Sequence, residues 1–96
     1  MAELTSASLS AENTFTNTVT HEGYFNLSIT GTFVATVTVQ RSFDGSNWND
    51  VDSFTTATEQ VGFEPESIYY RAGIKTGDYT SGTINIRLGY EDRESH

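Results

Sequence analysis

The chain has 96 residues, no cysteine, and thirteen acidic against five basic residues, for a formal net charge of -8. This length suits one domain with a single core and excludes a cleft between two lobes. Without cysteine there can be no disulfide and no thiolate metal site, and an acidic surface repels phosphate backbones, so we expect no nucleic-acid partner. No apolar run approaches the length that crosses a bilayer, and no membrane partner is expected either.

The first fourteen residues carry two leucines among small polar residues and predict an N-terminal arm or irregular segment over 1–14. Leu4 and Leu9 are its candidate contacts with a partner. Residues 15–90 are expected to form a single β-sandwich domain. The closing "EDRESH", 91–96, is expected to be a charged tail.

After residue 14 apolar and polar residues alternate through most of the chain, and no segment repeats apolar residues at helical spacing. Turn residues interrupt these runs about every ten positions. We therefore predict an all-β fold, either an antiparallel β-sandwich or a jelly-roll-like small barrel of about seven or eight strands. Pro65 is expected to end a short strand, "QVGF". The side chains expected to face the core are Phe25, Leu27, Ile29, Phe33, Ala35, Val37, Val39, Ile68, Tyr70, Ala72, Ile74, Ile84, Ile86, Leu88 and Tyr90.

The segment "VQRSFDGSNWNDV" predicts a strand, a turn and a strand. Asp44 can accept hydrogen bonds from nearby amides, Gly45 can take a positive φ, and Ser42 can tie back to the turn. Trp48 is large enough to close one end of the core. The turn needs no ligand to explain it, so we interpret it as structural.

The last third of the chain contains "SIYYRAGI" and "TINIRLGY", which we expect to pair as a hairpin around the loop "KTGDYTSG". In such a hairpin Arg71 and Arg87 would lie opposite or nearly opposite each other on the outer face. Two like charges so placed would repel each other unless carboxylates lie between them or a partner supplies some. This placement makes Arg71 and Arg87 candidate partner contacts.

Catalytic chemistry has little support in the sequence. His21 is the only histidine in the body of the chain, too few to build a zinc site or to stand in a recognisable triad. Asp44, Asp50 and Asp52 are expected on a turn and a solvated strand face rather than in a pocket. Oxygen ligands for calcium could come from Asp44, Asn47, Asn49 and Asp50, but their spacing matches no calcium loop. We therefore expect no enzyme activity, no catalytic residue, no metal and no cofactor.

The order of two segments carries a resemblance. "GTFVATVTVQRSFDG", followed by "YRAGIKTGDYTSGT" and a last strand ending in "RLG", is similar to a family of small proteins encoded among the virion genes of tailed bacteriophages. The resemblance runs from about Phe25 to Gly89. It implies a non-enzymatic virion part, either a capsid decoration protein or a head-fibre or tail component, located in the virion after assembly in the bacterial cytoplasm. It also implies the major capsid protein or other virion proteins as partners, and a homo-oligomer, with a trimer favoured.

On this hypothesis the N-terminal arm and one sheet edge engage the shell and stabilise the assembled head. The alternative is a carbohydrate- or host-surface-binding module, with Trp48 and Tyr79 as the candidate sugar-stacking side chains. A second alternative is a tail or connector component. Trp48 is expected to be exposed beside Tyr79 if the sugar-binding alternative holds, and buried if it does not.

Overall fold

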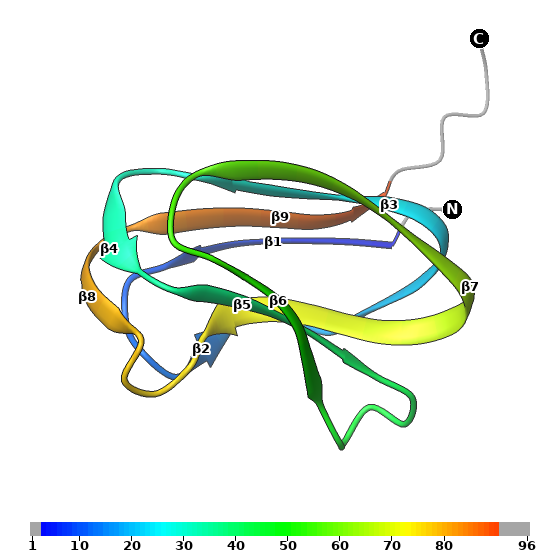
Figure 1. Ribbon diagram of the computed structural model, residues 1–96. Helices are drawn as coiled ribbons and strands as arrows, with labels where there is room; N and C mark the ends of the chain where they lie inside the picture. The colour runs from blue at the N-terminus through cyan, green and yellow to red at the C-terminus, as the bar shows by residue number, and fades with distance from the viewer. Residues whose placement is uncertain (1–2, 91–96) are drawn as a thin grey trace, which may run out of the picture.

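The computed structural model describes residues 3–90, which form β-strands joined by turns (Figure 1). The prediction of an all-β antiparallel fold is confirmed, and the sheets are not closed into a barrel. No helix within this described part is long and apolar enough to cross a membrane. The strands are β1 (Glu3–Leu9), β2 (Thr14–Phe15), β3 (Val19–Thr30), β4 (Phe33–Ala35), β5 (Val37–Ser42), β6 (Asn49–Phe54), β7 (Thr58–Ile74), β8 (Tyr79–Gly82) and β9 (Ile84–Tyr90).

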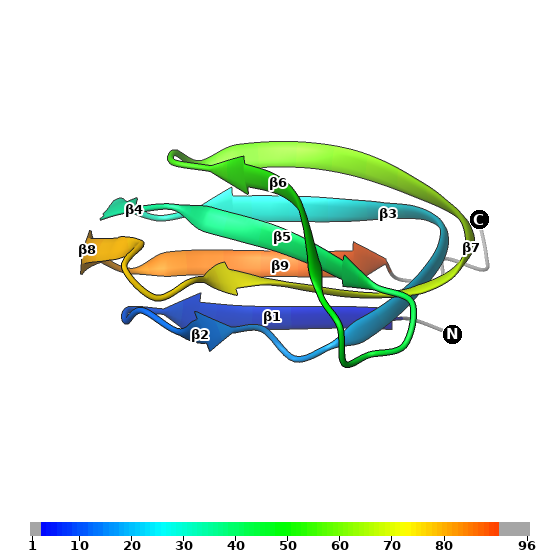
Figure 2. The same ribbon diagram turned by 60° about the horizontal axis from the view of Figure 1, so that its bottom comes forward.

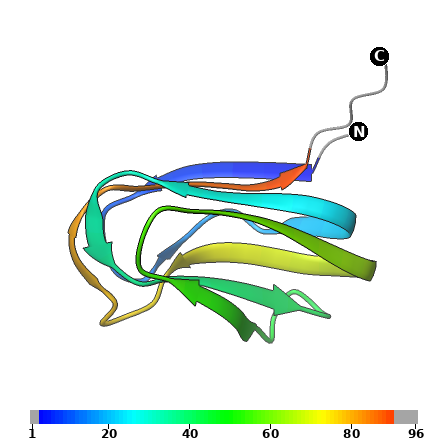
Figure 3. The same ribbon diagram turned by 45° about the horizontal axis from the view of Figure 1, so that its top comes forward.

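The sandwich is one antiparallel sheet bent into two layers. Its strand order is β1-β9-β3-β7-β5-β6, with β2 attached to β7, while β4 and β8 form a separate two-stranded sheet. The first half of β7 pairs with β3, and its second half pairs with β5. The first layer therefore holds β1, β9, most of β3 and the first half of β7, and the second holds β2, β5, β6 and the rest of β7 (Figure 3).

Both long strands bend where they pass between the layers. In β3 the register with β7 shifts between His21 and Gly23, and Gly23 has a φ of 88°. In β7 the pairing with β3 skips from Glu64 to Ile68. The expectation that Pro65 ends a strand is wrong, because Pro65 lies in this skipped stretch, where its missing N–H costs no ladder hydrogen bond.

The expected hairpin of the last third does not form. β9 pairs with β1 and β3, whereas the second half of β7 pairs mainly with β5. Arg71 lies opposite Gln40 in the second layer, while Arg87 lies between Ser6 and Ser28 in the first, so the two arginines are not neighbours. The loop "KTGDYTSG" contains β8, which pairs with β4. The alternation of apolar and polar residues predicts which face of the sheet a side chain takes, but it does not predict which strand pairs with which. For this reason the expected hairpin is wrong.

The core between the layers confirms the predicted inward faces. Of the fifteen side chains expected there, twelve are buried in one apolar cluster, and Phe33, Ala35 and Tyr90 pack against it partly exposed.

The N-terminal arm was a wrong expectation. Residues from Glu3 to Leu9 form β1, paired in register with β9 along its whole length from Glu3↔Tyr90 to Leu9↔Ile84. Leu9 is buried in the core and so cannot contact a partner. Small inward residues, Thr5 and Ala7, hid the alternation of this strand from an apolar count. The expected tail, 91–96, lies outside the described residues.

Candidate functional site

A buried polar cluster occupies the bent end of the sandwich. Glu64, next to the bend of β7, receives two hydrogen bonds from Arg41 on β5, from Nε to Oε2 at 2.9 Å and from Nη2 to Oε1 at 2.8 Å. The hydroxyl of Tyr70 donates to the same carboxylate. Glu64 and Tyr70 are buried, and Arg41 is half-buried. The cluster ties β5 to both halves of β7 across the bend.

The charges of this cluster stabilise one another. Burial alone would raise the pKa of Glu64, but the hydrogen bonds from Arg41 and Tyr70 outweigh it and hold that pKa below the usual range. The hydrogen bond to Glu64 likewise raises the pKa of Arg41. Burial, and then the bond to Glu64, raises the pKa of Tyr70 to about 12. At neutral pH the cluster therefore holds a carboxylate, a guanidinium and a neutral phenol.

His21 lies at the bend of β3 beside this cluster. Its ring is fully buried and stacks on Phe25, with ring centroids 4.2 Å apart and an interplanar angle of 11°. The Tyr70 ring is 5.0 Å away from the His21 ring. Histidine, glutamate and tyrosine can serve acid–base catalysis, but Glu64 and His21 are 5% and 0% exposed, out of reach of a substrate. We interpret the cluster as a support of the bend.

The turn between β5 and β6 is built as the sequence predicts. Asp44 accepts hydrogen bonds from the backbone amides of Ser46 and Asn47, both at 2.8 Å, and from the side chains of Ser42 and Asn47. These bonds lower the pKa of Asp44 well below its usual range. Gly45 has a φ of 81°, and its amide donates to Ser42. The Asp44 carboxylate is therefore engaged in hydrogen bonds within the turn itself.

The expectation that Trp48 closes one end of the core is wrong. Its indole lies on the outer face of the second layer, over the guanidinium of Arg71 at 4.4 Å, and Phe15 covers the same guanidinium at 4.3 Å. Arg71 also donates from Nε to Gln40 at 2.8 Å, and burial lowers its pKa. Trp48 directly precedes Asn49, which pairs with Arg41 of β5. Arg71 lies opposite the neighbouring Gln40 on the other side of β5. Arg71 is therefore enclosed by its own chain rather than presented to a partner.

Trp48 and Tyr79 do not form a shared face. Trp48 follows the turn after β5, whereas Tyr79 begins β8 at the opposite end of the sandwich (Figure 1). Tyr79 packs against the core and donates its hydroxyl to the Gly82 carbonyl at 2.8 Å. The two side chains cannot stack on one sugar together.

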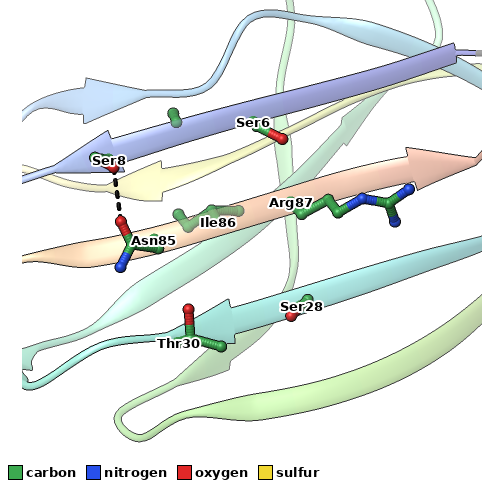
Figure 4. Close-up of a pocket in the computed structure, with 8 residues that line it drawn as sticks. Ser6, Ser8, Ser28, Thr30, Asn85, Ile86 and Arg87 are labelled. Atoms are coloured by element: carbon green, nitrogen blue, oxygen red, sulfur yellow. Dashed lines mark hydrogen bonds between the residues drawn. The ribbon is translucent and has the colours of Figure 1, made fainter.

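Arg87 lies in a polar groove on the outer face of the first layer. The groove has a volume of about 380 Å³, and Figure 4 shows its lining drawn from β1, β9 and β3. Ser8 donates to Asn85 at 2.6 Å, and Ser28 donates to Glu59 on β7, which lies beside the groove, at 2.5 Å. The polar residues of the lining are Ser6, Ser8, Ser28, Thr30, Asn85 and Arg87.

Three exposed apolar side chains gather on the same outer face, beyond the polar groove. Tyr24, Val61 and Phe63, which we call the aromatic patch, are 73%, 70% and 57% exposed. Tyr24 lies directly opposite Phe63 across β3 and β7, with ring centroids 4.9 Å apart. Exposed apolar groups that cluster in this way mark interaction surfaces, whereas single ones do not. Alternation with the inward Phe25 and Leu27 places Tyr24 outward, but the sequence alone does not reveal the patch, because its members meet only when β3 and β7 pair.

An apolar cleft adjoins the aromatic patch at the open side of the sandwich. Its volume is about 190 Å³, and it reaches between the layers to core residues such as Leu27 and Leu88. Val61 lines both the cleft and the patch, and Val51 of β6 forms the opposite rim. Leu4 is 36% exposed on the same outer face, and two strands, represented by Gly89 and Asn26, lie between it and Val61.

Among the described residues, no group of three or more histidine, aspartate or glutamate side chains is placed to hold a metal ion. Comparisons with protein-family models, with curated proteins and with solved structures found no match for this chain. The resemblance to a phage virion family therefore stays a sequence-based expectation, and the surfaces described above carry the functional argument.

Proposed function

We propose that this protein is a non-enzymatic virion component of a tailed bacteriophage, a decoration protein that binds and stabilises the assembled head. The observation that carries the proposal is the aromatic patch of Tyr24, Val61 and Phe63, a contiguous exposed apolar surface on an otherwise acidic chain. Exposed aromatic side chains provide large contact areas, and residues of this kind commonly dominate binding energy.

The acidic composition of the chain suits a virion component that is present in many copies. A formal net charge of -8 keeps free copies soluble and apart. A protein that binds the assembled shell and not its free subunits stabilises the shell by mass action. Such a function requires a preformed binding surface rather than a catalytic site. The order of the "GTFVATVTVQRSFDG" and "YRAGIKTGDYTSGT" segments supports the virion setting.

The proposal changes which residues are assigned to the partner contact. The aromatic patch replaces Leu9, which is buried, and Arg71, which is enclosed by Phe15 and Trp48. Arg87 stays a candidate because it lies on the same outer face as the patch, and Leu4 stays a candidate at the edge of that face. The partner proposed is the major capsid protein.

Co-sedimentation with DNA-free heads and with isolated tails tests the proposal. We expect the native chain to sediment with heads, and the double variant Tyr24→Ser, Phe63→Ser to bind at least about tenfold more weakly, because two exposed anchors are lost. Val34→Ser is the matched control, since Val34 is 59% exposed on β4, away from the patch. Binding to tails alone would make the protein a tail component, and binding to neither would refute the virion function.

A sugar-binding function has less support in the geometry. One face of Trp48 is covered by Arg71, and Tyr79 lies at the other end of the molecule. A glycan array with the native chain checks this alternative. Binding that is lost in Trp48→Ala would restore it.

A further inference from the structure

The open edge of β1 is a second candidate interaction surface, separate from the aromatic patch. β1 pairs with β9 over all seven of its residues without a bulge, and among the described residues no strand pairs with its other side (Figure 2). Alternate backbone N–H and C=O groups of an antiparallel strand point to that free side. From Leu4 to Leu9 the strand carries no charge and no proline. It is therefore a straight template for another strand.

The other long open edges carry features that discourage pairing, and the remaining open strands, β2, β4 and β8, are only 2, 3 and 4 residues long. β6 bears Asp50 and Asp52, its register with β5 shifts between Val39 and Gln40, and Lys75 binds Asp50 at 2.6 Å. The first half of β7, which pairs only with β3, carries Glu59 and runs into Pro65. Charges, bulges and proline are the usual protection of edge strands. The contrast singles out β1 as the edge left open to a partner.

We propose that β1 pairs antiparallel with β1 of a second copy of this chain, so that two first layers join into one continuous sheet. A pairing centred on Ser6 places Leu4 opposite the second copy's Ser8 and Thr5 opposite the second copy's Ala7. Leu4, Ser6 and Ser8 then share the outer face, and Thr5 and Ala7 share the inner face, so each side chain stays on the face that it has in the single chain.

A second copy fits this edge because the edge is neutral from Leu4 to Leu9, and in a pairing centred on Ser6 the remaining residue, Glu3, falls opposite Leu9 and not opposite another charge. Two chains of net charge -8 repel each other over most of their surfaces, but no like charges meet along β1. The repulsion that remains is long-range and is screened by salt. The contact buries only the flank of one strand, less than a standard interface, so we expect a dissociation constant on the order of 100 μM.

The symmetry of this contact determines how many copies can assemble through it. A strand that pairs with its own copy antiparallel is related to it by a two-fold axis, which closes the assembly at two copies. The trimer favoured by the family resemblance would need a different, head-to-tail contact. The pairing at β1 thus predicts a dimer in solution, and it stands independently of head binding.

Sedimentation equilibrium of the isolated chain from about 10 μM to about 1 mM tests the pairing. We expect a monomer–dimer equilibrium that tightens severalfold between about 0.05 and about 0.5 M salt. Ser6→Lys and Ser6→Asp should each raise the dimer dissociation constant at least about fivefold, because like charges then meet at the axis. An equimolar mixture of the two variants should restore dimerisation through a Lys–Asp pair.

Ser53→Lys is the matched control, since Ser53 is an exposed serine on the other edge strand, β6. It should leave the dimer unchanged. A chain that stays monomeric at the highest concentration, or a trimer, would overturn the proposal. So would a dimer that the Ser6 variants do not weaken, a mixture that fails to restore it, or a dimer lost in the Tyr24→Ser, Phe63→Ser variant.

Discussion

Replacing Glu64 with glutamine removes the charge at the centre of the buried cluster while it keeps the shape of the side chain. The Glu64 side chain is 6% exposed and that of Arg41 is 26% exposed. Breaking a fully buried ion pair costs about 3–5 kcal/mol, and an exposed pair is worth about 0–1 kcal/mol. Since water reaches part of Arg41 and glutamine can still accept one hydrogen bond, we expect a loss of about 2–3 kcal/mol in the free energy of unfolding at pH 7.

Urea unfolding of the native chain and of Glu64→Gln measures this loss, and thermal unfolding should show a fall of about 10–20 °C. The pH dependence identifies the charge as the cause. The pKa of Glu64 is lowered in the folded state from an ordinary value of 4.5, so the unfolded chain binds the proton first. The stabilisation is therefore present above about pH 4.5 and is lost as the pH falls through the folded pKa.

Glu59→Gln is the control, because Glu59 is an exposed glutamate on the same strand that accepts a hydrogen bond from Ser28 at 2.5 Å. Its replacement should change the free energy of unfolding by less than about 0.5 kcal/mol. If the Glu64 variant were as stable as this control, or if its deficit stayed the same at pH 3 as at pH 7, the reasoning about the buried charge would be wrong.

Further substitutions test the other contacts described above. Arg71→Gln should cost about 1–2 kcal/mol by urea unfolding and shift the emission of Trp48, the one tryptophan of the chain, because the cation between two rings is lost. Tyr70→Phe should remove a phenol that titrates near pH 12 in the ultraviolet spectrum, and with it a stability contribution that is present below about pH 10 and lost as the pH rises toward 12; an unchanged titration curve would contradict this. Gly73→Ala places a Cβ within 2.2 Å of a β2 carbonyl oxygen and should cost about 1–3 kcal/mol as β2 is displaced. Gly77→Ala, with nothing within 4 Å but a φ of 90°, should cost only about 1 kcal/mol, and an equal loss in the two glycine variants would contradict the steric argument.

The inward and outward faces of the strands could be predicted from the sequence because each depends on local alternation alone. Ile68, Tyr70 and Ala72 read as one face and are buried together. The turn at Asp44 and Gly45 was predictable for the same reason, since its hydrogen bonds close within a few residues.

The partners of the strands could not be predicted in this way. Pairing is a long-range choice, and equally regular strands such as β7 and β9 can each fit several neighbours. The predicted placements of Trp48 and Arg87 are wrong for this reason, since the surroundings of both side chains are set by strands distant in sequence. The buried cluster was missed because Arg41, Glu64 and Tyr70 carry no motif, and only the bend of β7 brings them together.

The pairing of β1 with β9 has a consequence for how the protein is made. The first described strand completes its hydrogen bonds only with the last, which also lies between β1 and β3 in the sheet. A nascent chain that still lacks Ile84–Tyr90 leaves β1 with no neighbour and one side of β3 open. Folding of the first layer must therefore wait until β9 has been synthesised. Since non-local strand pairing is slow, on the order of milliseconds to seconds, a chain that lacks β9 is left with an unpaired β1 for at least that long.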